Sequence, residues 1–147
     1  MDEIVDDRPG AGPTLLFAYG TLLPGEPRWG FLAPYVVDQG EPAAVAGWLY
    51  DTGHGYPAAR FAWEASDATA PLIHGRRFVL DPGRRAEAWR VLDEVEGAVE
   101  GLYRRVEVEL ADGSAACAYE YGGGLELRPI PSGRWIADAD ASDDGAG

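Results

Sequence analysis

The most informative stretch of this chain is Phe17-Ala18-Tyr19-Gly20-Thr21-Leu22-Leu23-Pro24-Gly25. The apolar run over residues 14–18 predicts a buried strand, and residues 19–22 then leave the sheet at a turn that Pro24 and Gly25 keep from continuing as strand. Gly20 can adopt backbone angles that are closed to other residues. Such a turn can point several consecutive N–H groups the same way. Local chemistry allows two interpretations, an ordinary strand exit or a loop that holds an anionic group.

Length and composition predict one globular domain. The chain has 147 residues, of which 46% are hydrophobic, and this is enough for a substantial core. No apolar run is long enough to cross a bilayer, and the acidic start Met1-Asp2-Glu3 lacks the basic region of a secretory signal. A single cysteine, Cys117, excludes an internal disulfide framework and a cysteine-rich zinc site. We therefore expect a cytoplasmic protein that makes no membrane contact.

The acidic charge is unevenly distributed. The formal net charge is −13, of which residues 1–13 carry −3 and residues 137–147 carry −4. We expect these two segments to be flexible acidic tails that flank one domain over residues 14–136. The acidic body should repel phosphate backbones, so nucleic-acid binding is not expected. All 12 basic residues are arginine, which excludes a Schiff-base lysine mechanism.

Residue patterns predict a mixed set of strands and helices, and thus an α+β fold. The expected strands are 14–18, 35–37, 43–50, 56–61, 72–80, 102–110, 114–121 and 126–130. The expected helices are 26–32 and 82–96, the second with Asp81 as N-cap and Gly97 at its end. Its predicted apolar stripe consists of Ala86, Trp89, Leu92 and Val95.

Three acidic residues near the end of the long predicted helix are candidates for a catalytic carboxyl group. Glu94 and Asp93 lie four and three residues after Arg90, so both can pair with it on the solvent face. Glu96 instead falls on the apolar stripe and at the helix C-terminus, where the dipole disfavours negative charge. Burial in that place would raise its pKa, as a general base working near neutral pH requires. The alternative is a frayed helix end with Glu96 in water.

Several segments together resemble the signatures of the gamma-glutamylcyclotransferase-like superfamily. Residues 17–22 resemble its Y-G-(S/T)-L motif, and Leu92-Asp93-Glu94-Val95-Glu96-Gly97 resembles L-D-x-x-E-G. Residues 102–105 are similar to the Y-x-R that follows, and Gly55-Tyr56-Pro57-Ala58 resembles G-x-Y-P-A. Residues 116–119 stand where the family has A-W-x-Y. When residues 92–97 and 102–105 are counted as one signature, the four pieces occur in the family's order.

The resemblance implies a small mixed β-barrel flanked by helices, and it places the catalytic glutamate at Glu96. It also implies that backbone N–H groups of the first turn hold the substrate head. The substrate-binding residues it suggests are Tyr19, Gly20, Thr21, Leu22 and Tyr119, with Tyr121 as an alternative to Tyr119. Arg134 departs from the acid that relatives carry in an S-G-D-W element, so the role of that corner is open.

The implied reaction converts a gamma-glutamyl compound into 5-oxoproline and a free amine. The substrate's own α-amine attacks its γ-carbonyl, so the reaction requires no cofactor and no metal. The leaving group stays open among glutathione, gamma-glutamyl amino acids, gamma-glutamyl amines and a gamma-glutamyl protecting group on a natural product. Two other classes stay open as well: a binding relative without turnover, and an unrelated acidic adaptor in which Glu96 lies far from the Tyr19-Gly20 turn. The sequence leaves the oligomeric state undetermined.

Other notable side chains are expected to be structural. His54 and His74 lack the clustered acids of a metal site. One member of Arg104 and Arg105 should tie the helix end to the sheet. Cys117, in the middle of a predicted strand, should be a small buried filler.

Overall fold

The structure, a computed structural model, describes residues 14–62, 70–98 and 103–135. Its elements are β1 (Leu15–Ala18), α1 (Trp29–Leu32), β2 (Glu41–Asp51), β3 (Pro57–Phe61), β4 (Leu72–Val79), α2 (Arg85–Gly97), β5 (Arg104–Glu109), β6 (Ala115–Glu120) and β7 (Arg128–Pro129). The predicted acidic tails, 1–13 and 137–147, lie outside the described residues, as does position 102 of a predicted strand.

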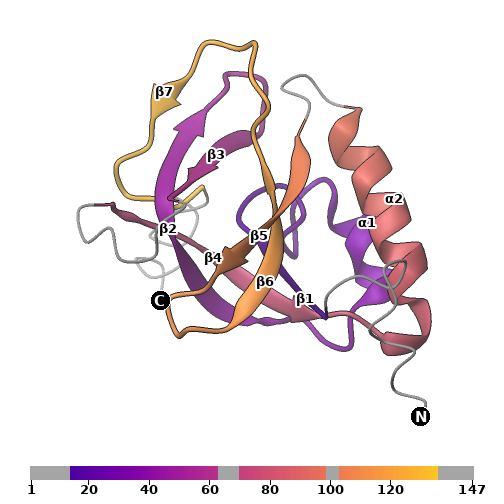
Figure 1. The fold of residues 1–147 in the computed structure, drawn as a ribbon. Coiled ribbons are helices and arrows are strands. Elements are labelled where there is room, and N and C mark those ends of the chain that lie inside the picture. Colours follow the sequence, from indigo (N-terminus) through magenta and orange to yellow (C-terminus); the bar gives the residue numbers. More distant parts are fainter. Residues whose placement is uncertain (1–13, 63–69, 99–102, 136–147) are drawn as a thin grey trace, which may run out of the picture.

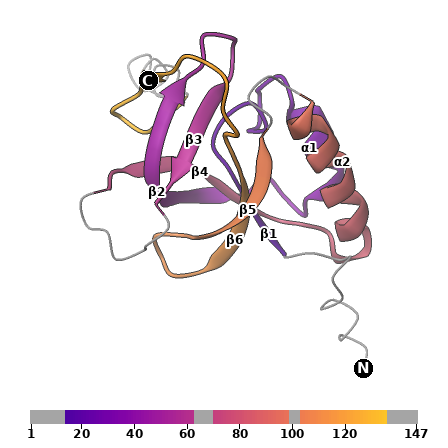
Figure 2. The same ribbon diagram turned by 45° about the horizontal axis from the view of Figure 1, so that its top comes forward.

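Six strands form a nearly closed mixed barrel in the order β3-β2-β4-β1-β6-β5, with β7 paired to β2 (Figures 1 and 2). The pairing of β1 with β6 is parallel, and the other pairings are antiparallel. Two backbone hydrogen bonds help to close the barrel, from Ala111 N to Ala44 O at 2.8 Å and from Tyr121 N to Ala59 O at 3.0 Å. The α+β prediction, a small mixed β-barrel flanked by helices, is therefore confirmed.

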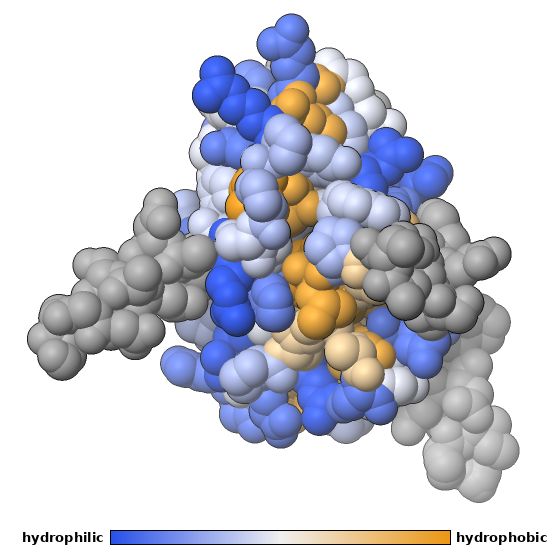
Figure 3. All heavy atoms as spheres, turned by 90° about the vertical axis from the view of Figure 1, so that its left-hand side faces the viewer, coloured by the Kyte–Doolittle hydropathy of each residue, from blue (hydrophilic) through white to orange (hydrophobic). Residues whose placement is uncertain are grey.

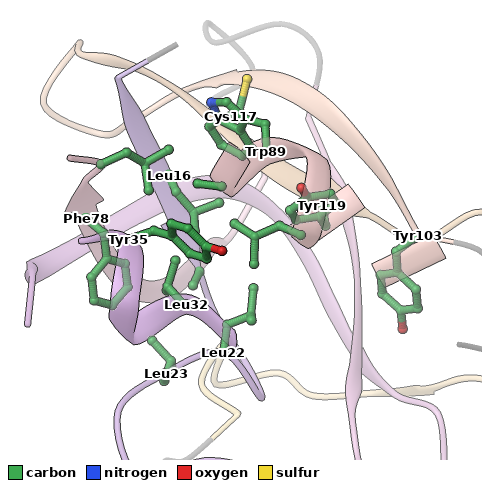
Figure 4. Close-up of a cluster of buried hydrophobic side chains, with 14 of the residues drawn as sticks. Leu16, Leu22, Leu23, Leu32, Tyr35, Phe78, Trp89, Tyr103, Cys117 and Tyr119 are labelled. Carbon is green, nitrogen blue, oxygen red and sulfur yellow. The ribbon is translucent and has the colours of Figure 1, made fainter. Parts of the chain in front are cut away.

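Strand β1 divides the core into two parts, because successive side chains of a strand point to opposite faces. Leu16 and Ala18 pack in a cluster that includes residues of both helices, which lie side by side against the barrel (Figure 1). Figure 4 shows this cluster, with Leu16 and Leu32 among its members. Phe17 and Tyr19 join a second cluster made of strand residues. The end of β1 therefore lies between the barrel interior and the helices.

Helix α2 follows a 3-10 turn at Pro82–Arg84, where the Asp81 carboxylate accepts a hydrogen bond from Gly83 N at 3.0 Å. The buried residues of α2 are Arg85, Ala88, Trp89, Leu92 and Glu96. The predicted stripe was wrong in part, because Ala86 is exposed and Val95 only half-buried. A helix turns about 100° per residue, so a strict interval of three residues drifts off the buried face by about 60° at each step.

Two predicted elements in the first third of the chain needed correction. The helix expected at 26–32 is reduced to Trp29–Leu32. The strand expected at 35–37 was wrong: Ala33–Tyr35 forms a 3-10 turn, and Val36 makes only an isolated bridge. Proline occurs within or next to each segment, and its missing N–H group and fixed backbone angle shorten regular structure.

The surface on the far side of the barrel from the helices carries some apolar side chains, which form a band in Figure 3. Among the large apolar side chains, Trp48 of β2 and Leu72 of β4 are exposed. Apolar residues are common on protein surfaces and by themselves indicate no partner. No helix in the described ranges is both long enough and apolar enough to cross a bilayer.

Candidate active site

A cavity of about 30 Å³ lies beside the end of β1. Its lining residues are Phe17, Ala18, Tyr19, Gly20, Thr21, Leu22, Arg28, Tyr56, Pro57, Glu96, Tyr103 and Tyr119. All of them are buried except Arg28 and Tyr56, which are half-buried. The structure therefore brings together Glu96, Tyr119 and the Tyr19-to-Leu22 turn. The adaptor hypothesis, which required Glu96 to lie far from this turn, was wrong.

The turn after β1 is folded back on itself by two backbone hydrogen bonds. Leu23 N donates to Gly20 O at 3.0 Å, and Arg28 N donates to Thr21 O at 2.8 Å. Within the described residues, the N–H groups of Gly20, Thr21 and Leu22 have no hydrogen-bond acceptor. Buried backbone donors are almost always paired, so three successive free amides beside a cavity are typical of a site that receives an anion or a polarised carbonyl.

Gly20 is required by a close approach and not by its backbone angle. A Cβ atom built there would lie 2.5 Å from Pro57 Cγ and 2.7 Å from Pro57 Cδ. The left-handed angle that the sequence suggested is absent, since Gly20 is not among the glycines with positive φ. The first turn and the Tyr56-Pro57 segment thus pack directly against each other, and a side chain at position 20 would separate them.

Glu96 lies in the last turn of α2, and its carboxyl group faces the cavity. The residue is only 7% exposed, and this burial raises the pKa of its carboxyl group to about 7. Arg28 acts in the opposite direction, with Nη1 at 3.6 Å from Glu96 Oε2. That oxygen has no hydrogen-bond partner among the described residues. A carboxyl group in this state can take up and return a proton near neutral pH.

Three tyrosine side chains form a fixed wall of the cavity. The Tyr19 hydroxyl donates to the Tyr119 carbonyl, and the Tyr119 hydroxyl donates to Asp93 Oδ1 at 2.7 Å. The Tyr103 hydroxyl donates to the Pro57 carbonyl at 2.6 Å. Burial raises the pKa of Tyr19, Tyr103 and Tyr119, so all three remain protonated donors. Their hydroxyls hold the site's frame together.

Tyr121, the alternative to Tyr119, does not line the cavity. Its hydroxyl donates to Leu125 O at 3.0 Å and accepts from Leu125 N, so it orders the segment that follows β6. Since Tyr121 serves this loop, Tyr119 remains the candidate of the two.

The surroundings of Asp93 differ from the prediction. Its carboxylate lies 3.3 Å from Arg105 Nη2, whereas a pair with Arg90 was expected. Arg105 also lies over the Trp89 ring, 4.5 Å from the ring centroid. Strand β5 was not placed relative to α2 by the sequence pattern, so this partner could not be anticipated. Arg105 is the arginine that ties the helix end to the sheet, as one of Arg104 and Arg105 was expected to do.

Six lining residues were not predicted as part of the site. Five of them belong to segments that the resemblance already marked, so their motifs were an available signal: Phe17, Ala18, Tyr56, Pro57 and Tyr103. No motif marked Arg28, because it lies in a loop rich in proline and glycine. Its position depends on the hydrogen bond from its backbone N–H to Thr21 O.

Other reactive side chains do not form a second centre in the described part of the chain. Residues 14–62, 70–98 and 103–135 contain no group of three His, Cys, Asp or Glu side chains arranged for a metal ion. Burial raises the pKa of the Cys117 thiol to about 11, so the thiol stays protonated. Cys117 is a buried core residue, as predicted.

Comparison with known proteins agrees with the barrel fold. The model of the family described as "Gamma-glutamyl cyclotransferase, AIG2-like" matches residues 16–137. The match covers most of the chain, and the chain therefore belongs to this family. Among curated proteins, no significant match was found.

Solved structures share the fold at low sequence identity. An uncharacterised protein from Pyrococcus horikoshii has a TM-score of 0.63 and 20% identity, covering 92% of this chain and 100% of its own. A mouse AIG2-like protein has a TM-score of 0.56 and 15% identity, covering 76% and 79%. A gamma-glutamyl cyclotransferase, with no organism stated, has a TM-score of 0.54 and 19% identity, covering 90% and 80%. These similarities establish the gamma-glutamyl cyclotransferase-like fold.

Proposed function

We propose that this chain is an enzyme that releases 5-oxoproline from a gamma-glutamyl amine or peptide, with Glu96 as general base and general acid. One observation carries the proposal: a buried carboxyl group with a pKa of about 7 shares a small cavity with three unpaired backbone amides. Membership in the family of AIG2-like gamma-glutamyl cyclotransferases supports the substrate class.

The chemistry needs one proton shuttle. Glu96 in its ionised form takes a proton from the substrate's α-ammonium group, and the freed amine attacks the γ-carbonyl carbon. A carbon–nitrogen bond forms and closes a five-membered ring. The bond from the same carbon to the leaving nitrogen then breaks, and Glu96 returns its proton to that nitrogen. The products are 5-oxoproline and a free amine, and the enzyme is unchanged.

The turn after β1 contributes to catalysis by holding the substrate in place. In this proposal the amides of Gly20, Thr21 and Leu22 hold the glutamyl head by its α-carboxylate. Tyr19 and Tyr119 line the same cavity and keep the head in a conformer that can close the ring. Because nucleophile and electrophile belong to one molecule, holding this conformer is a large part of the catalysis.

Glu96→Gln tests the proposal. The variant keeps the size of the side chain but cannot accept the proton, so kcat/KM should fall by about 10²- to 10⁴-fold. The measurement is 5-oxoproline release from a panel of gamma-glutamyl amines, gamma-glutamyl amino acids and glutathione. Glu94→Gln is the matched control, because this neighbouring carboxylate is exposed, and it should leave turnover unchanged.

Full turnover by Glu96→Gln would refute the role of Glu96. A wild-type chain that binds gamma-glutamyl compounds but releases no 5-oxoproline would instead indicate the alternative, a binding relative without turnover.

A further inference from the structure

Among the described residues that line the cavity, Arg28 is the only one with a basic side chain. It lies at the rim together with Tyr56, whereas Glu96 lies inside. The chain as a whole carries a formal net charge of −13. The positive charge of Arg28 beside the candidate catalytic acid is therefore opposite in sign to the net charge of the protein. Its position calls for an explanation beyond surface charge.

The contacts of Arg28 leave most of its hydrogen-bonding capacity unused. Within the described residues, its ion pair is with Glu96 at 3.6 Å, and its guanidinium carbon lies 5.5 Å from the centroid of the Tyr56 ring. A charge-assisted N–H to carboxylate bond is about 2.7–2.9 Å long, so the ion pair is a loose one. A guanidinium group carries five N–H donors in a planar fork that fits a carboxylate. Arg28 is therefore held by the Tyr56 ring with donors available at the cavity rim.

Balancing the negative charge of Glu96 does not explain the position of Arg28 well. The pKa of Glu96 is still about 7, because burial outweighs the effect of Arg28. An arginine whose purpose was to keep the carboxylate ionised would approach it closely and pair with both oxygens. The loose contact instead suits a residue that shares its charge with a ligand.

The proposed reaction places the leaving nitrogen against Glu96, which returns the proton to it. In a departing α-amino acid, the carboxylate is bonded to the carbon next to that nitrogen. Standard bond lengths put a carboxylate oxygen about 3 Å from the nitrogen, comparable with the 3.6 Å between Glu96 Oε2 and Arg28 Nη1. A carboxylate of the leaving group therefore comes within reach of the guanidinium. The substrate's own α-carboxylate already has the deeper amides of residues 20–22.

We infer that Arg28 is a specificity residue that binds the carboxylate of the departing amino acid, so that the preferred substrates are gamma-glutamyl α-amino acids. This inference rests on the proposed function, since it assigns a leaving group to that reaction.

Two substrates that differ only in this carboxylate provide the test: gamma-glutamyl-alanine and gamma-glutamyl-ethylamine. Release of 5-oxoproline is measured for both, and the ratio of their kcat/KM values is compared between the wild type and Arg28→Gln. We expect the wild type to prefer the alanine compound, and the ratio to fall by about 10- to 100-fold in the variant, as for loss of a charged hydrogen bond. Arg28→Lys should retain part of the preference, because an ammonium group binds carboxylate without the planar fork.

Arg104→Gln is the matched control, because Arg104 is an exposed arginine beside a buried glutamate outside the cavity. Its ratio should equal that of the wild type, and thermal melting checks that every variant is folded. If both substrates slow equally in Arg28→Gln and Arg28→Lys and the ratio is unchanged, Arg28 serves the glutamyl head or Glu96, and the inference fails while the proposed function stands. If the wild type releases 5-oxoproline from neither these substrates nor the wider panel, both fail.

Discussion

The protein buries two glutamate side chains, Glu96 and Glu120, whose hydrogen bonding differs. Glu96, at the end of α2, is 7% exposed, and Glu120, at the end of β6, is 4% exposed. Glu120 Oε2 accepts a hydrogen bond from Phe61 N at 3.0 Å, whereas Glu96 Oε2 has no hydrogen-bond partner among the described residues. Burial alone therefore does not distinguish a structural carboxylate from a candidate catalytic one. The distinguishing feature is whether the protein itself satisfies the buried oxygen.

The reason for Glu120 lies in how the barrel closes. Phe61 ends β3 at the place where β3 approaches β6, and the Glu120 side chain supplies an acceptor for its N–H group. Arg104, 3.9 Å away, is mostly exposed and contributes little. Glu120 thus completes a backbone hydrogen-bond pattern, while the Glu96 carboxyl group remains available to a substrate.

The largest expected difference between the two residues is the effect of Glu96 on how the free energy of unfolding depends on pH. Its pKa is about 7 in the folded protein, against 4.5 for the free side chain. Below pH 4.5 both states are protonated and stability is unaffected. Between pH 4.5 and 7 the unfolded chain ionises this carboxyl group while the folded protein keeps it protonated, so about 3 kcal/mol of stability is lost by pH 7 and stays lost above it. Glu96→Gln should therefore gain about this much unfolding free energy relative to wild type between pH 4 and pH 8, measured by urea denaturation.

The same ionisation should control turnover. Only ionised Glu96 can accept the proton, so kcat/KM of the wild type should rise with pH and level off above about 7. A flat profile between pH 5 and 8, together with an unchanged stability difference for Glu96→Gln, would mean that Glu96 is ionised throughout this range and would refute the raised pKa.

A smaller effect of opposite sign is expected for Glu120→Ala. The substitution leaves the Phe61 N–H group without an acceptor, and the free energy of unfolding should fall by about 1–3 kcal/mol. Glu120→Gln keeps an oxygen acceptor and should recover most of this loss with turnover close to wild type. If Glu120→Gln folded normally but lost activity to the extent expected for Glu96→Gln, the assignment of Glu120 as the structural carboxylate and Glu96 as the catalytic one would be overturned.

The smallest effect is expected for Tyr119→Phe, which removes the hydroxyl hydrogen bond to Asp93. Because Asp93 is partly exposed, the cost should be about 1 kcal/mol of unfolding free energy. Tyr35→Phe is a matched control, since the Tyr35 hydroxyl donates to Glu87 on the same helix at 3.0 Å. We expect kcat/KM of Tyr119→Phe to stay within about tenfold of wild type; a greater fall, absent in Tyr35→Phe, would place this hydroxyl on the substrate.

Much of the fold was predictable because the patterns involved are local. The alternation in β4 and β5 and the apolar run of β1 identify strands directly. Failures occurred where proline interrupts a pattern, as at Tyr35 and Val36, or where a three-residue interval imitated the true helical period, as at Ala86. For the candidate site, the motifs marked Glu96 and Tyr19, whereas Arg28 belongs to no pattern. The pairing of Asp93 with Arg105 was also missed, because it joins a helix to a strand whose relative placement no periodicity records.

The amino-acid sequence by itself determined the α+β class, the family and the choice of Glu96 as candidate acid, since these depend on local patterns and on motif order. Only the tertiary structure decided that Glu96 Oε2 has no hydrogen-bond partner among the described residues while Glu120 Oε2 has one, and that Arg28 lies at the cavity rim. The physical reason is that burial and the distances between groups far apart in the chain arise from packing. They set the pKa and the availability of a side chain, and neither is encoded in its neighbours along the sequence.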